Sequence, residues 1–189
     1  MAFDDGINAA NAAVAVSGQI FVAEEDAAIP TSLTFNPETN DYVGLGYLSE
    51  DGFTITPEST STDLRGWQNS ATLRSLITES KLTATFTMVE TKPEVIEMYW
   101  GTTVNTTTGA YDVDPGATGG KRRFLFAVMD NGEVELGSYL GEVTERTEIT
   151  NQSGEIKGYG VTVTFYPDAA YGGKTGRVFD SRLVAPVGP

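Results

Sequence analysis

The sequence contains neither histidine nor cysteine. Without these residues it has no Ser-His-Asp triad, no Cys-His nucleophile, and no zinc, haem or iron–sulfur site that relies on either residue as a ligand. Without cysteine it forms no disulfides, so cysteine usage gives no sign of an oxidising compartment. The commonest hydrolase and metal chemistries are therefore excluded, and we expect no cofactor and no metal.

Basic residues are scarce, with 12 Lys and Arg against 26 Asp and Glu, which gives a formal net charge of −14. Binding to nucleic-acid phosphates normally needs Lys and Arg to replace counterions, so this chain is a poor nucleic-acid binder. The first basic residue is Arg65, and a basic cluster follows at residues 121–123. Two interpretations remain open. The acidic first third is a solvated surface, or it meets the basic cluster of another copy head to tail.

Long hydrophobic runs are missing as well. Asp4 and Asp5 lie where a secretory signal carries positive charge, so we expect no targeting segment. The least charged early stretch, residues 9–23, is too short and too polar to span a bilayer. We therefore expect no membrane partner.

The dominant pattern in the chain is an alternation with a period of two. Residues 81–90 place Leu82, Ala84, Phe86 and Met88 on one face and threonines on the other, which predicts a half-buried strand. Further strands are predicted at 157–166, at 122–129, from 133 with a continuation over 143–149, and near 14–23, 42–48, 53–56 and 73–79. The pattern indicates a mainly β chain with a sandwich-like or barrel-like fold.

One short helix is predicted at about residues 91–100. Thr91 and Glu94 have the spacing of a capping box, and Pro93 suits the first turn. Gly101 is placed to end the helix, and Trp100 is expected to dock it on the sheet.

The rest of the chain divides into arms and loops around one predicted domain, residues 1–189. Residues 1–13 and 183–189 are expected to be N- and C-terminal arms. Residues 57–68 are rich in Ser and Thr and are expected to form an arm or a long hairpin loop. Residues 105–120, rich in Thr and Gly, are expected to form a long loop.

Motifs for catalysis or ligand binding are weak. Gly172–Thr175 ends like a phosphate-binding loop, but Asp168 stands where that motif needs its first glycine. Asp112 and Asp114 resemble only the first half of a calcium loop. Paired carboxylates could still serve a glycosidase, and Trp67 could bind a sugar, so a hydrolase and a carbohydrate-binding module remain open alternatives.

A larger pattern covers residues 42–101. It consists of a Gly/Asp turn at 46–57, an arm with Trp67-Gln68, a Thr-rich strand at 81–90 and the helix 93–101. This pattern resembles the major tail proteins, or tail tube proteins, of long-tailed, siphovirus-type bacteriophages, particularly those of actinobacterial hosts. The predicted strands of residues 121–166 fit the same family in their order.

The resemblance implies a structural virion protein that is not an enzyme. Such proteins are β-sandwiches with one helix and extended arms, and six copies form a ring by extending one another's sheets. Rings stack into a hollow tail tube that conducts viral DNA, together with a tape measure protein and with terminator and initiator proteins. The alternative is a monomeric carbohydrate-binding β-sandwich module.

A tube of this kind needs inter-subunit contacts and a lumen that does not bind DNA. The candidate inter-subunit residues are Glu58, Asp63, Trp67, Gln68, Lys121, Arg122 and Arg123. An electronegative lumen would repel phosphate and let DNA slide. The candidate lumen residues are Glu133, Glu135, Glu145 and Glu148.

Overall fold

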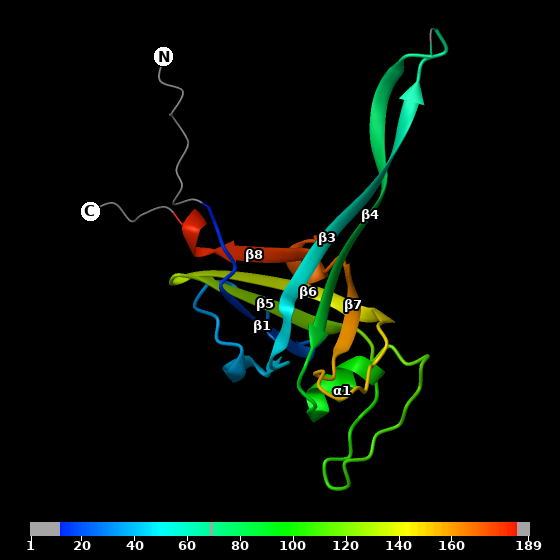
Figure 1. The fold of residues 1–189 in the computed structure, drawn as a ribbon. Helices are drawn as coiled ribbons and strands as arrows, with labels where there is room; N and C mark the ends of the chain where they lie inside the picture. The colour runs from blue at the N-terminus through cyan, green and yellow to red at the C-terminus, as the bar shows by residue number, and fades with distance from the viewer. Residues whose placement is uncertain (1–11, 69, 185–189) are drawn as a thin grey trace, which may run out of the picture.

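All eight strands of the computed structural model, which describes residues 12–68 and 70–184, belong to one antiparallel sheet (Figure 1). The sheet order is β2-β1-β5-β6-β7-β4-β3, and β8 also pairs with β6. The strands are β1 (Ser17–Glu24), β2 (Val43–Gly44), β3 (Leu48–Arg65), β4 (Thr72–Met88), β5 (Arg122–Asp130), β6 (Glu133–Arg146), β7 (Tyr159–Tyr166) and β8 (Gly176–Asp180). Short 3-10 turns are η2 (Glu38–Asn40), η3 (Ala169–Tyr171) and η4 (Ser181–Leu183). The mainly β prediction is confirmed.

The main hydrophobic core forms on one face of this sheet. Ala84, Phe86 and Met88 of β4 are buried, and Leu82 is partly buried beside them, as the alternation predicted. Helix α1 (Pro93–Trp100) adds its buried residues to the same core, and Trp100 packs against it. The predicted docking of the helix through Trp100 is confirmed.

The other face of β5 and β6 carries a smaller core. Leu125 and Leu136 are buried there with Tyr42, and Leu33 and Phe35 from the long segment after β1 pack on them. Successive residues of β5 therefore serve different cores, because side chains alternate across a strand. Both faces of this part of the sheet are covered.

The sheet curls until its two ends approach each other, but it does not close. Phe53 of β3 lies against Phe126 of β5, with ring centroids 4.9 Å apart. A Cβ built on Gly18 of β1 would lie 3.5 Å from the Phe53 ring. No β1–β3 pairing occurs among the described residues, so a seam remains between the two strands.

The predicted capping box at the start of α1 is wrong. The N-cap residue is Lys92, with no capping side chain, and Pro93 is the first helical residue. The Thr91 hydroxyl is instead 3.1 Å from the Tyr159 hydroxyl, within hydrogen-bonding distance. Gly101 does end the helix, with φ of 70° and its N–H donated to the carbonyl of Glu97.

Several predicted strand bounds were too short or misplaced. The strands predicted at 53–56 and 73–79 are parts of β3 and β4, which run on as one long hairpin. The strand predicted to continue to residue 149 ends at Arg146, after an irregularity between Val143 and Glu145. Only residues 43–44 form a separate strand within the predicted 42–48.

The predicted arms and loops differ in how much of them the structure describes. Of residues 57–68, residues 57–65 belong to strand β3, and residues 66–68 lie in the tip of the β3–β4 hairpin. Residues 105–120 form a loop with one isolated bridge, between Asn105 and Ala110. Most of the predicted N-terminal arm, residues 1–11, and most of the C-terminal arm, residues 185–189, lie outside the described residues.

Candidate assembly surfaces

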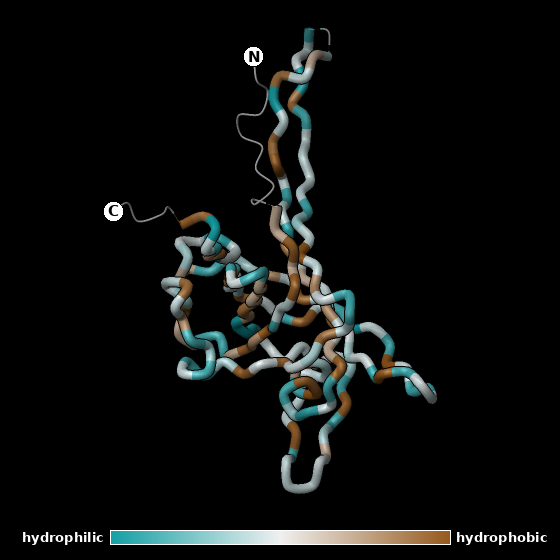
Figure 2. The backbone as a smooth tube through the Cα atoms, turned by 60° about the vertical axis from the view of Figure 1, so that its left-hand side comes forward, coloured by the Kyte–Doolittle hydropathy of each residue, from teal (hydrophilic) through white to brown (hydrophobic). Residues whose placement is uncertain are grey.

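The outer half of the β3–β4 hairpin, here called the arm (residues 58–81), projects away from the rest of the chain (Figures 1 and 2). Its strands keep an antiparallel register from the pair Glu58 and Lys81 to the pair Arg65 and Thr72. Every residue described in 58–65 and 72–81 is exposed. The arm is therefore a two-stranded ribbon with solvent on both faces.

Large apolar side chains lie on both faces of the arm. Leu76 and Ile77 are consecutive residues of β4, so they point to opposite faces, and both are exposed. Leu64 and Leu73 are exposed nearer the tip, and Trp67 at the tip is 97% exposed. A solvated ribbon gains nothing from these side chains, so they indicate a surface that another molecule covers.

The arm tip is also basic. Arg65 and Arg74 are the only charged residues between positions 64 and 74. The tip thus carries two positive charges and an exposed indole ring, in a chain whose formal net charge is −14.

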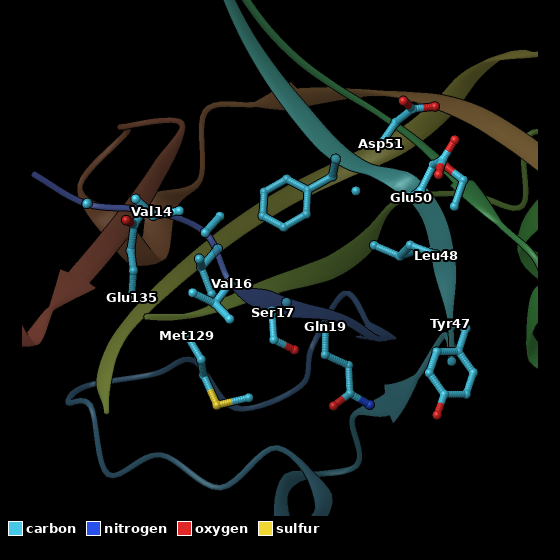
Figure 3. A pocket seen from close by; sticks show the side chains of 18 of the residues that line it. Val14, Val16, Ser17, Gln19, Tyr47, Leu48, Glu50, Asp51, Met129 and Glu135 are labelled. Carbon is cyan, nitrogen blue, oxygen red and sulfur yellow. The ribbon is translucent and has the colours of Figure 1, made fainter. Parts of the chain in front are cut away.

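A cleft of about 870 Å³ lies along the seam between β1 and β3, near the root of the arm (Figure 3). Its apolar lining comes from the segment before β1 and from three strands. The apolar residues are Val14, Val16, Leu48, Phe53, Val128 and Met129. Four carboxylates, those of Glu50, Asp51, Glu90 and Glu135, and the single basic residue Arg182 complete the charged lining.

Glu90 fixes one wall of the cleft. Its carboxylate accepts a hydrogen bond of 2.7 Å from the N–H of Tyr47 and lies 3.6 Å from the Lys92 ammonium. Gly46 has φ of 81°, and a Cβ on it would collide with the Glu90 carboxylate. Glycine at position 46 therefore allows the turn before β3 to pack against the end of β4.

Arg182 fixes the opposite wall. Its guanidinium bonds Asp180 at 2.9 Å, approaches Glu135 at 3.3 Å, and lies 3.7 Å from Asp130. The hydrogen bond from Arg182 lowers the pKa of Asp180 below its ordinary value. Asp130 also accepts a hydrogen bond of 3.0 Å from the N–H of Val14. These contacts join η4, the β5–β6 turn and the segment before β1.

The basic cluster at 121–123 divides in the structure. The Lys121 ammonium lies 5.4 Å from the centre of the Tyr166 ring, and Arg122 lies 3.9 Å from Glu24. Arg123, in contrast, is only 6% exposed and donates to Asp168 at 2.7 Å within the chain. Arg123 thus has a structural role, and it presents no free guanidinium to a neighbouring copy.

The four candidate lumen residues do not gather on one surface. Glu133 accepts a hydrogen bond from Ser181, and Glu135 bonds Arg182, so both lie near η4. Glu145 pairs with Thr162 of β7 near the far end of β6, and it is exposed. Glu148 is exposed beyond the end of β6.

Sequence reasoning missed a continuous threonine surface on the β3-β4-β7-β6 part of the sheet. Directly paired residues there include Thr54 with Thr85, and Thr85 with Thr162. Because paired residues of neighbouring strands lie on one face, these side chains form a single hydroxyl-rich surface. This threonine face comprises Thr54, Thr56, Thr83, Thr85, Thr144, Thr162 and Thr164, with Glu142 and Glu145 at its β6 border. Of these, Thr83 and Thr164 are each only 8% exposed. The alternation of Thr54 and Thr56 in the sequence was the signal that could have placed β3 in this surface.

Comparison with protein families identifies the chain. The family model described as phage tail tube protein matches residues 5–174. The chain belongs to the phage tail tube protein family. A comparison with curated proteins finds no match.

Family membership agrees with the geometry of the arm and the sheet. Tail tube proteins are structural components of the phage tail that assemble into a tube, so this is a virion protein from a family of structural proteins and not of enzymes. Neither the family nor the fold favours the carbohydrate-binding alternative. The described helices include none long and apolar enough to cross a membrane. Across residues 12–68 and 70–184, no cluster of three or more His, Cys, Asp or Glu is placed to hold a metal ion.

Proposed function

We propose that this tail tube protein builds a siphovirus-type tail, in an actinobacterial phage, from hexameric rings whose arms join one ring to the next. The observation that carries the proposal is the arm itself. An isolated two-stranded ribbon is at best marginally stable in water, and this one has apolar side chains on both faces. Burial between other copies in a stacked tube would stabilise it.

Ring formation uses the open edges of the sheet. The outer edge of β3 pairs with no strand among the described residues. An exposed edge is an aggregation hazard in a monomer, but it is an assembly device when a neighbouring copy adds its own strand. Domain 1–189 acts as one building block, and its terminal arms contribute further contacts in the tube.

The threonine face lines the lumen in this proposal. Its hydroxyls are uncharged, and Glu142 and Glu145 add negative charge at its border. The only basic residue in line with this face at the arm root, Lys81, is paired directly with Glu58. Such a wall carries more acidic than basic side chains at its border, so it repels phosphate and DNA slides. Glu148 extends the acidic border, whereas Glu133 and Glu135 serve contacts near η4.

The arm residues Glu58, Asp63, Trp67 and Gln68 are proposed as contacts between rings. Lys121 and Arg122, at the start of β5, are proposed as contacts with a neighbouring copy. The ends of the tube would meet a tail terminator and an initiator, and its lumen would hold a tape measure protein during assembly.

An armless variant tests the proposal. Residues 59–80 are replaced by an Asn-Gly turn, which leaves Glu58 and Lys81 as the last facing pair. The core residues of β4 begin only at Leu82, so the variant is expected to keep its circular dichroism spectrum and cooperative unfolding. Electron microscopy is expected to show tubes for the full chain and none for the variant. Tubes of normal appearance from a folded armless variant would overturn the proposal.

A further inference from the structure

We propose that the cleft between β1 and β3 is the receptor for the arm tip of a second copy of this chain. The proposal rests on the proposed function, and it names the site at which one ring holds the next. In it, Trp67 packs against the apolar lining of Val14, Val16 and Met129. Arg65 and Arg74 face the acidic side of the cleft.

The first argument for this contact is the complementary charge of the cleft and the tip. Four carboxylates and one guanidinium line the cleft, and Arg182 is already bonded to Glu135 and Asp180. Glu50 and Asp51 are exposed, and neither forms an ion pair within the described residues. The tip supplies the positive charges of Arg65 and Arg74, and the nearest acidic residue, Asp63, lies further from the turn and accepts a hydrogen bond from Ser75. An acidic cleft attracts this basic tip.

The second argument is that both the tip and the cleft expose apolar side chains. Trp67 is almost fully exposed at the tip, and tryptophan is among the residues that dominate interface energies. The cleft volume of about 870 Å³ lies in the range of pockets that bury most of a drug-sized ligand. It can therefore take an indole ring together with its neighbouring side chains. Its floor contains exposed apolar groups, with Val14 64%, Val16 66% and Met129 48% exposed.

The third argument is the position of the tip and the cleft along the chain. Both belong to β3: residues 48–53 line the cleft, and the strand then runs out to the tip after Arg65. When the tip of one copy binds the cleft of another copy, the two contacting surfaces differ, so the interface is heterologous. Such an interface adds copy after copy without closing when the two surfaces lie at opposite ends of each copy. Each copy that receives a tip presents its own tip further along. This geometry produces an open-ended stack.

Engineered cysteines test the contact directly, since the chain has none of its own. The test variant combines Gln68→Cys at the tip with Ser49→Cys in the cleft, and the control combines Gln68→Cys with Ser153→Cys in an exposed loop. Mild oxidation of assembled tubes is expected to give a ladder of disulfide-linked chains for the test variant. The control is expected to remain monomeric in a denaturing gel.

The outcomes separate this inference from the proposed function. If the wild-type chain forms no tubes, the proposed function fails. If the cysteine variants form tubes but the test pair gives no ladder, or the control pair gives an equal one, the tip lies elsewhere and only the cleft proposal is overturned.

A charge exchange gives a second test that needs no cysteine. Arg65→Glu with Arg74→Glu is expected to reduce sedimentable tubes at least tenfold, and adding Glu50→Arg with Asp51→Arg is expected to restore them. The control, Lys157→Glu with Lys174→Glu, makes the same change in net charge outside the cleft and tip, and it is expected to assemble normally. Loss without restoration, or equal loss in the control, would overturn the cleft as the receptor.

Discussion

Arg123 of β5 donates a hydrogen bond of 2.7 Å to the carboxylate of Asp168, which precedes η3. Both side chains are almost fully buried. Asp168 also accepts a hydrogen bond from the N–H of Ala170, so the pair fixes the turn that leads to β8. The pair thereby connects the edge of the smaller core to the C-terminal part of the chain.

We predict that breaking this pair destabilises the fold strongly. Asp168→Asn or Arg123→Met leaves one buried charge without its partner, and such changes cost about 3 kcal/mol or more. Combining Asp168→Asn with Arg123→Met in one chain is expected to cost less than the sum of the two single changes, because neither charge is then left alone. Urea denaturation of the four chains measures this coupling. Strict additivity would contradict the account.

The same pair predicts a response to acid. Burial alone would raise the pKa of Asp168, but the hydrogen bonds from Ala170 and Arg123 and the charge of Arg123 together lower it below its ordinary value. A depressed folded-state pKa gives stability that is present above the ordinary value and lost as pH falls through the folded value. The free energy of unfolding should therefore decline with acid more steeply in the wild type than in Asp168→Asn. Glu148→Gln, at an exposed site, should decline like the wild type.

The alternation of β5 explains why the basic cluster does not form one patch. Three consecutive basic residues look like one patch, but successive side chains of a strand point to opposite faces. Arg122 lies beside Glu24, whereas Arg123 enters the interior and meets Asp168, 45 residues away. No local sequence pattern indicates that Asp168 is the partner of Arg123, so sequence analysis could not assign Arg123 a structural role.

The inner strands were predictable and the arm was only partly so. Leu82, Ala84, Phe86 and Met88 alternate because one face of β4 is buried, and that signal identified the strand. Between residues 72 and 81 the same strand is exposed on both faces, so its hydrophobic periodicity vanishes. The cleft was not predictable at all, because it forms between segments that meet only through the curl of the whole sheet.

Gly101 offers a prediction about the packing of the helix end. A Cβ at this position would lie 2.6 Å from the backbone nitrogen of Gly119, and φ is 70°. Gly109 has nearly the same φ, 69°, but open space around it, so Gly109→Ala measures the backbone strain alone. Gly101→Ala is expected to lower the free energy of unfolding by at least about 1 kcal/mol more than Gly109→Ala. Equal losses would mean that the loop around Gly119 moves away freely.

The length of the arm limits the repeat of the tube. From Phe53 to Arg65, β3 extends over roughly 40 Å at about 3.3 Å per residue. If the tip of one copy reaches the root of the next, the axial distance between rings is at most about this length. Helical reconstruction of electron micrographs gives the repeat. A clearly longer repeat would show that the tip does not reach the cleft of the adjacent ring.

The central claim is that this chain alone contains the surfaces that build a hollow tube. Electron microscopy of the purified full chain at rising concentration, with and without fragments of preformed tubes as seeds, tests that claim most directly. The account predicts six-fold rings and uniform hollow tubes that lengthen with concentration or grow from the seeds. Small single particles at every concentration, with no growth on the seeds, would contradict it.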